Sequence, residues 1–433
     1  MPLRLSMPTP LARRPHLTPD AGELPTAEEA RNGRLLVWEA PFTSLVLLAA
    51  PSFYALFAIE MGGSNAAVGW LSSGPALLSL LWLIPCSQLI QRASGYKLQL
   101  LIGIGLHRLL ILLMAATPLL PPAWRPWGLV ALVTLTALPL QYWGLTFDTF
   151  MGDSFAPRHL ARFIGRRWAA LDITNTVAVI LLGKMIDAAP FPYNWMALFG
   201  GLSLLGVISL FFIARLDYPS RHAPADDAPA RGENLLDLLR RHRAFILLET
   251  GICVIYAGFF AAAPVLRIYW MRDLGATGAW VGILTAAFSA GAVLGGLLWG
   301  RWSKPTRDRT YALVGGLGAM AAYPCLTAAF TALPPLVAVI AAGGFLVVGN
   351  DLLLFKRVVA TSPRRQRATF IAINNLVINL VAFLAPLAST ALVDRLGARP
   401  VLWLAAGVGL VGAVLTYAIG WHPIPQETTE PCV

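Results

Sequence analysis

Charged residues are scarce in this chain. Asp, Glu, Lys and Arg make up 13% of its 433 residues, whereas a soluble domain carries roughly 25%. Hydrophobic residues make up 57%, and the mean hydropathy is +0.65. This composition excludes an ordinary soluble domain. It also excludes nucleic acid as the reason for the net charge of +11, because no basic domain lies outside the apolar runs.

Cysteine and histidine are also sparse. The 4 cysteines have neither disulfide nor metal-site spacing. Of the 6 histidines only His107 lies within an apolar run, so no histidine cluster can hold a metal. No nucleotide-binding motif occurs outside the apolar runs. We therefore expect no enzymatic centre, no metal and no cofactor, and any work the protein does must draw on a gradient.

The apolar residues are gathered into runs of about 20, which is the length that crosses a hydrocarbon core about 30 Å thick. Twelve such runs predict an all-α polytopic membrane protein that contacts lipid. The expected spans are 35–60, 65–90, 97–119, 127–152, 167–188, 194–216, 244–270, 278–300, 310–331, 334–356, 368–393 and 399–421.

The longest polar interval, 217–243, divides the spans into two sets of six. We expect an N-terminal bundle at 34–216 and a C-terminal bundle at 244–421, joined by a cytoplasmic linker. The proline-rich segment 1–33 is expected to be a disordered cytoplasmic tail, and 422–433 a cytoplasmic C-terminal tail.

Basic residues are distributed unevenly between the two sides. Most of the 33 Lys and Arg residues lie in the N-terminal tail and in the connections that follow even-numbered spans. The opposite side carries only Arg125, Arg267, Arg272, Arg395 and Arg399. By the positive-inside rule, both termini are cytoplasmic and the protein spans the plasma or inner membrane.

Two stretches of sequence recur in order in the two halves. ARFI at 161–164 returns as ATFI at 368–371, and GGSNAAVGWL at 62–71 returns as GATGAWVGIL at 275–284. These matches predict two parallel six-helix repeats. Such pseudo-symmetric repeats are a transporter architecture, with a binding site near the midplane between the halves.

The basic connections resemble those of the major facilitator superfamily. PRHLARFIGRR at 157–167 and SPRRQRATFIAINN at 362–375 are similar to its segment after spans 4 and 10. SQLIQRASGYK at 87–97 and GLLWGRWSKPTRDR at 296–309 are similar to its signature after spans 2 and 8, with Gln91 and Gly300 where that motif has Asp. The cytoplasmic motif residues carried over are Arg92, Arg158, Arg162, Arg166, Arg301 and Arg367.

The resemblance implies twelve helices in two six-helix bundles, with helices 1, 4, 7 and 10 lining a central cavity. It also implies secondary active transport of a small organic molecule by rocker-switch alternating access. The alternative is a non-transporting receptor or membrane assembly factor with the same fold, which the altered signature would favour. We expect a monomer.

Each of the four expected lining helices carries one acid near its cytoplasmic end. These acids are Glu39, Asp148, Glu249 and Asp351. Charges inside a membrane are costly and are candidates for function, so the acids could form a protonatable ring that couples transport to protons. Alternatively, they pair with the adjacent basic connections and hold the inner face shut.

Arg108 is the deepest charge in the sequence and needs a partner. Glu39 is one geometric possibility, and a backbone carbonyl or cavity water is another. The neighbouring His107 is expected to point to a different face of the helix.

Aromatic residues gather on three of the expected lining helices. They are Phe53, Tyr54 and Phe57, then Tyr142, Trp143 and Phe147, and then Tyr256, Phe259 and Phe260. They could stack against a substrate, although packing and lipid contact also explain the spacing. Basic residues on the lining helices, such as Arg267 and Lys356, lie near helix ends, which favours a neutral or cationic substrate.

Overall fold

The structure is a computed structural model that describes residues 25–92, 95–219, 242–303, 308–362 and 367–418. Throughout these ranges the regular secondary structure is helical. Twelve helical spans are long and apolar enough to cross a membrane, six before residue 219 and six after residue 242. The prediction of an all-α protein with twelve spans is confirmed.

The described residues of the N-terminal half form eleven helical segments. They are α1 (Ala27–Ser44), η1 (Leu45–Ala49), α2 (Ala50–Ser52), α3 (Tyr54–Glu60), α4 (Asn65–Arg92), α5 (Tyr96–Met114), η2 (Thr117–Leu119), α6 (Arg125–Leu135), α7 (Ala137–Ser154), α8 (Pro157–Ala188) and α9 (Tyr193–Ala214).

In the part of the C-terminal half that the structure describes there are nine helical segments. They are α11 (Arg243–Ile268), η3 (Tyr269–Asp273), α12 (Gly278–Trp302), α13 (Asp308–Gly316), η4 (Leu317–Ala322), α14 (Tyr323–Ala329), α15 (Leu333–Thr361), α16 (Arg367–Leu396) and α17 (Ala398–Ala418).

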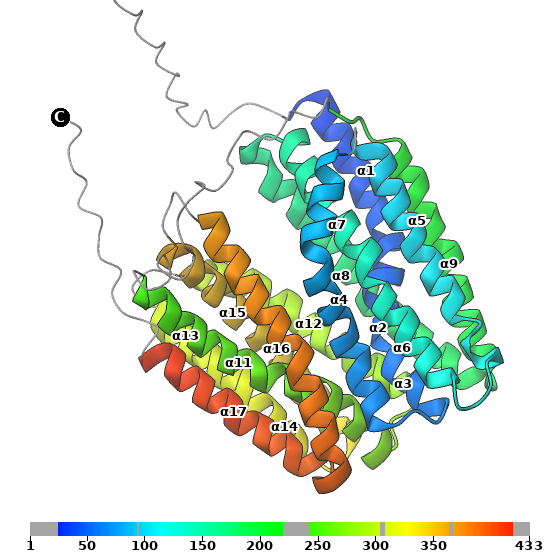
Figure 1. The fold of residues 1–433 in the computed structure, drawn as a ribbon, viewed down its shortest axis with the longest axis vertical. Helices are drawn as coiled ribbons and strands as arrows, with labels where there is room; N and C mark the ends of the chain where they lie inside the picture. Colours follow the sequence, from blue (N-terminus) through cyan, green and yellow to red (C-terminus); the bar gives the residue numbers. More distant parts are fainter. Residues whose placement is uncertain (1–24, 93–94, 220–241, 304–307, 363–366, 419–433) are drawn as a thin grey trace, which may run out of the picture.

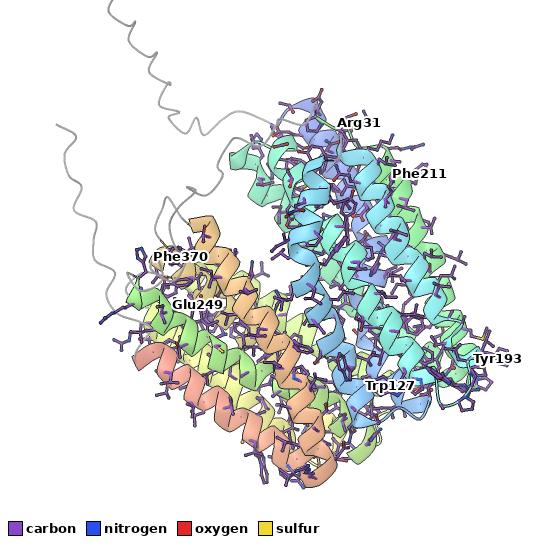
Figure 2. The ribbon with its side chains drawn as sticks, viewed as in Figure 1. Arg31, Trp127, Tyr193, Phe211, Glu249 and Phe370 are labelled. Atoms are coloured by element: carbon purple, nitrogen blue, oxygen red, sulfur yellow. The ribbon has the colours of Figure 1, made fainter. Side chains whose placement is uncertain are left out.

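The two halves form two bundles of helices (Figure 1). They converge toward the bottom of the view, near α3 and α14, and diverge toward the top, where α1 and α16 begin. We call the top the predicted inner end and the bottom the predicted outer end. Figure 2 places Arg31 at the inner end, and Trp127 and Tyr193 at the outer end. Exposed aromatic residues there suit a membrane interface.

Helix pairs α8–α12 and α4–α16 join the halves. Three sets of hydrogen bonds connect the halves at the predicted outer end. Asn65 donates to Asp394 (2.7 Å), Arg272 donates to the carbonyl of Gly63 (2.6 Å), and Asp187 accepts from the amides of Gly278 (2.7 Å) and Ala279 (2.8 Å). Asp187 belongs to the N-terminal half and caps the start of α12 in the C-terminal half. One carboxylate therefore satisfies the first amides of that helix and also joins the two halves.

Glycines bring the backbones of α8 and α12 into direct contact. A Cβ atom on Gly183 would lie 2.3 Å from the carbonyl oxygen of Gly278, and one on Gly282 would lie 2.2 Å from that of Val179. No side chain fits at these two positions, so the sequence fixes how closely the halves approach.

The first helix of each half ends in the same kind of turn. Gly62 follows α3 with φ of 83°, and Gly275 follows η3 with φ of 64°. Positive φ favours glycine because it has no Cβ. These two residues are paired in the sequence repeat, so the repeat marks equivalent turns.

The prediction of disorder for 1–33 is wrong for 27–33, which begin α1, whereas 1–24 lie outside the described residues. Thr26 and Glu29 form a capping box at the start of α1. Glu29 also accepts from the amide of Ala156 (2.7 Å), next to the start of α8. Arg31 pairs with Asp217 at the end of α9 (2.9 Å). These tertiary contacts stabilise a polar first turn that hydropathy does not detect.

The helix of span 5 also begins earlier than expected, at Pro157 instead of residue 167. Proline suits the first turn of a helix, where its missing N–H has no partner to lose. Arg158, Arg162 and Arg166, which are spaced four residues apart as on one face of a helix, therefore all lie on α8. The linker core 220–241 and the tail 422–433 lie outside the described residues.

Candidate functional site

Arg108 lies on α5 and is almost fully buried, at 1% exposure. Its guanidinium donates to the carbonyl of Gly206 (3.3 Å), to Thr43 (3.1 Å) and to Ser209 (3.4 Å). A backbone carbonyl is therefore one partner, as proposed. The expectation for His107 is wrong, because its Nδ1 lies 2.8 Å from Nη1 of Arg108. The flexible arginine stem lets the guanidinium fold back onto the neighbouring ring.

Glu39 pairs directly with Arg167 on α8, and not with Arg108. Its Oε2 lies 3.0 Å from Nη2 and 3.3 Å from Nε of Arg167, and Glu39 is fully buried. Thr43 donates its hydroxyl proton to Glu39 and accepts from Arg108. The sequence-based pairing of Glu39 with Arg108 is thus replaced by a link through one hydroxyl. The resulting chain of contacts, Arg167–Glu39–Thr43–Arg108, connects α8, α1 and α5.

Arg167 is a buried polar residue that sequence reasoning missed. It directly follows Arg166, and both were counted with the basic connection. Adjacent residues on a helix point about 100° apart, and here Arg166 is exposed whereas Arg167 is buried, with its guanidinium 4.5 Å from the ring centre of Phe147. The paired arginines at the start of an apolar run were the available signal.

The four acids occupy four different environments. Glu39 is paired with an arginine, and Asp148 is exposed. Asp351 accepts from the hydroxyl of Tyr256 (2.8 Å) and from Asn350 (3.4 Å). Glu249 is 7% exposed, and neither of its carboxylate oxygens has a hydrogen-bond partner within the described residues. Of these four acids, pairing with a basic connection therefore explains Glu39 alone.

Glu249 lies toward the predicted inner end of the C-terminal half, as does Phe370 (Figure 2). It lines a pocket of about 320 Å³ together with residues of α11 and α16. A second pocket, of about 230 Å³, is lined by Asp351, Tyr256 and Asn374. The side-chain oxygen of Asn374 also has no partner within the residues described. The inner part of this half therefore holds polar groups that water or a proton could satisfy.

Two cavities lie where the halves face each other. The first, which we call the N cavity, has a volume of about 280 Å³ and is lined mainly by the N-terminal half, including Tyr54 and His107. The second, which we call the C cavity, has a volume of about 370 Å³ and is lined mainly by the C-terminal half. Ser72 of α4 and Arg267 of α11 line both.

Arg267 was expected near a helix end, away from the substrate. It is indeed the second-last residue of α11, but it lines both cavities. A position near a helix end therefore does not keep Arg267 out of the cavities, and the neutral or cationic substrate stays a prediction. Position along a helix does not reveal where the cavity between two bundles closes.

The aromatic candidates separate into two groups. Tyr54, Phe259 and Phe260 line the cavities between the halves, and Tyr256 lines the pocket of Asp351. The others pack within the N-terminal half or line a groove on it: Phe53, Phe57, Trp143 and Phe147 are buried, and Tyr142 lines an apolar groove of about 800 Å³ between α4, α5 and α7. Phe57, for example, stacks on Trp195 with 4.5 Å between ring centres.

The basic motif residues lie at the predicted inner end. Arg162, Arg166 and Arg301 are exposed, whereas the side chains of Arg92, Arg158 and Arg367 lie outside the described part. An ion pair in the C-terminal half was not foreseen: Lys356 on α15 lies 2.5 Å from Asp308 at the start of α13. Lys356 also donates to Ser303 (2.9 Å), so these residues fasten three helices of one bundle together.

Within the residues described, no group of three or more His, Cys, Asp or Glu side chains could hold a metal ion.

Several solved structures have a similar arrangement of helices. The nucleoside transporter NupG superposes with a TM-score of 0.69 at 10% identity, covering 90% of this chain and 99% of that one. A bacterial homologue of the human lysosomal transporter Spinster, in an inward-facing and occupied conformation, gives 0.62 at 13% identity, covering 92% and 99%. A POT family transporter in complex with a thioalcohol-conjugated peptide gives 0.66 at 13% identity, covering 90% and 95%.

The model of the Major Facilitator Superfamily matches residues 248–431. The chain has the major facilitator superfamily fold. The match covers the two C-terminal connections, 296–309 and 362–375, and confirms the resemblance there. No curated protein matches the chain by sequence. At these identities the superfamily likeness establishes the fold, and both the fold and the family match are those of membrane transporters.

Proposed function

We propose that this protein is a secondary active transporter that moves a small organic molecule across the plasma or inner membrane by rocker-switch alternating access. The observation that carries the proposal is where the described residues of the two halves bond to each other: at the predicted outer end and, through Asn175 and Ser289 (3.0 Å), along the contact between α8 and α12. Hydrogen bonds join the halves at the predicted outer end, whereas cavities lie between them and the bundles diverge toward the inner end (Figure 1).

The interface is suited to rocking because few strong contacts must break. Each outer bond joins groups near a helix end, where water can replace the partner. The close α8–α12 packing through Gly183 and Gly282 supplies a smooth surface about which the halves can turn. In the opposite state the outer bonds would be open, and the exposed arginines of the inner end would approach the other half.

We further propose that Glu249 couples transport to protons. A buried carboxylate without donors costs several kcal/mol to keep ionised, so this enclosed environment favours the neutral acid. When the halves move and water reaches the carboxyl group of Glu249, the ionised form becomes favourable and the proton can be released. Asp351 already has two donors, and Glu39 has an arginine, so both have less to gain from a proton.

The motion can be tested without knowing the substrate. Spin labels at Arg162→Cys and Arg301→Cys would report the inner end, and labels at Tyr193→Cys and Leu396→Cys the outer end, in a background that lacks the native cysteines. Double electron–electron resonance in nanodiscs should give two populations of molecules. In one of them the distance between the two inner labels is shorter and the distance between the two outer labels is longer than in the other. A pair within one bundle, Arg162→Cys with Trp38→Cys, should keep a single distance.

Uptake by proteoliposomes under an imposed pH gradient is the functional counterpart. A transporter should accumulate a member of a labelled metabolite panel faster with the gradient than without it. If both label pairs stay at one distance across pH and no panel member enters, the protein is a non-transporting receptor or assembly factor with this fold.

A further inference from the structure

Arg267 is a cation at the meeting point of two cavities. It lies on α11 in the C-terminal half, and the N cavity that it lines belongs mainly to the other half. Within the described part of the chain, its guanidinium makes no hydrogen bond and no ion pair. By contrast, two buried arginines of the membrane region, Arg108 and Arg167, are held by hydrogen bonds.

The groups around Arg267 are hydrogen-bond donors, not acids. Trp270 lines the C cavity, is 7% exposed, and its Nε1 has no acceptor among the described residues. Ser72, Thr285 and Tyr323, which carry hydroxyl groups, line the same cavity. Glu249 and Asp351 belong to other pockets.

An enclosed guanidinium without a counter-charge is unfavourable in a membrane protein, where charges pair with one another or face a water-filled cavity. An indole N–H without an acceptor adds a second unmet requirement. A carboxylate would satisfy the guanidinium, because arginine binds it with two parallel hydrogen bonds, and donors of the cavity wall can reach its free lone pairs. One cation matches one negative charge, so a monoanion fits better than a doubly charged phosphate.

The rest of the C cavity is apolar and aromatic. Phe259, Phe260 and Phe288 line it, together with Trp270. Its volume of about 370 Å³ lies at the lower end of the range of small-molecule sites, which is roughly 300–1,000 Å³. Aromatic walls beside a charged group suit a ligand with one polar end and one apolar body.

We propose that Arg267 and the C cavity bind a monovalent organic anion, with its carboxylate on Arg267 and its apolar or aromatic body against the phenylalanines. That the anion is the transported substrate rests on the proposed function. That it binds at this site does not.

The test is equilibrium binding to the purified protein in nanodiscs. The probes are phenylacetate, naphthylacetate and octanoate, each compared with its neutral amide and with the corresponding amine. The carboxylates should bind at least tenfold more tightly than the amides or amines, as measured by isothermal titration calorimetry. Arg267→Gln should weaken carboxylate binding about tenfold or more and leave amide binding unchanged, since it removes the charge and the bidentate fork.

Arg243→Gln is the matched control, because it removes an exposed arginine from the start of the same helix. If Arg267→Gln does not fold, Arg267→Lys and Trp270→Phe should each weaken carboxylate binding selectively. The inference is overturned if no carboxylate of the panel binds, if amides or amines bind as well, or if the Arg267 and Trp270 variants bind like wild type.

The outcomes separate the two proposals. Selective carboxylate binding by a protein whose labelled ends never move would uphold the anion site and refute transport. Alternating distances with preferential binding of amines would uphold transport and refute the anion site.

Discussion

Replacing Arg167 by methionine should destabilise the N-terminal half strongly. The substitution keeps the length and apolar character of the stem and removes the charge. The side chain of Arg167 is 8% exposed and that of Glu39 is 0% exposed, with 3.0 Å between them. After the change, Thr43 remains as the direct hydrogen-bond donor to the Glu39 carboxylate among the described residues.

Removing one partner of a buried ion pair costs about 3–5 kcal/mol, because it leaves an uncompensated buried charge. Here Arg108 lies one hydroxyl away from Glu39 and compensates part of that charge. We therefore expect a loss near the lower limit, about 3 kcal/mol in the free energy of unfolding. Adding Glu39→Gln removes the unpaired charge, so the double variant should recover about 2 kcal/mol of the loss.

Reversible unfolding in mixed micelles, followed by tryptophan fluorescence, would measure these differences. Arg166→Met is the control, since that neighbouring arginine is exposed and should change the free energy by no more than about 0.5 kcal/mol. The reasoning would be refuted if Arg167→Met were as stable as Arg166→Met, or if the double variant were less stable than Arg167→Met alone.

Three further outcomes follow from the proposed mechanism. Glu249→Gln, which mimics the neutral acid, should abolish the stimulation of uptake by a pH gradient and preserve counterflow exchange; stimulation equal to wild type would exclude Glu249 as the coupling group. Linking Asn65→Cys to Asp394→Cys with a short cleavable thiol reagent should stop uptake, and cleavage should restore it; continued uptake by the linked protein would show that the outer bonds need not open. A reporter fused after Ser64 should be external and one fused after Arg309 cytoplasmic; the reverse result would invert the positive-inside assignment.

Hydropathy predicts the fold well because span length depends on bilayer thickness and not on partners. The start of α1 was missed because its first turn is polar and is stabilised by distant groups. Glu29 bonds to Ala156, and Arg31 to Asp217. Contacts of this kind join segments more than a hundred residues apart in sequence, so local composition carries no trace of them.

The candidate site was only partly predictable for a related reason. A charge such as Arg108 within an apolar run identifies itself, because it is costly wherever it lies. Its partner depends on how each helix is rotated about its own axis. In this structure Glu39 faces Arg167, so Arg108 bonds to Thr43 instead. Arg267 was undervalued because cavity depth depends on where two bundles meet, which is set by packing between α4 and α16 and between α8 and α12.

The two proposals together determine the electrical character of transport. If Glu249 carries one proton and Arg267 one monoanion, each cycle moves no net charge across the membrane. A membrane potential does work on net charge, about 2.3 kcal/mol per elementary charge for 100 mV, so it should neither drive nor oppose this uptake. In proteoliposomes a potassium diffusion potential set with valinomycin should leave the accumulation of a bound carboxylate unchanged, whereas an inward proton gradient should drive it. Accumulation driven by the potential alone would mean that more than one proton accompanies each anion. A second acid would then have to take part, and Asp351, in its polar pocket, is the candidate.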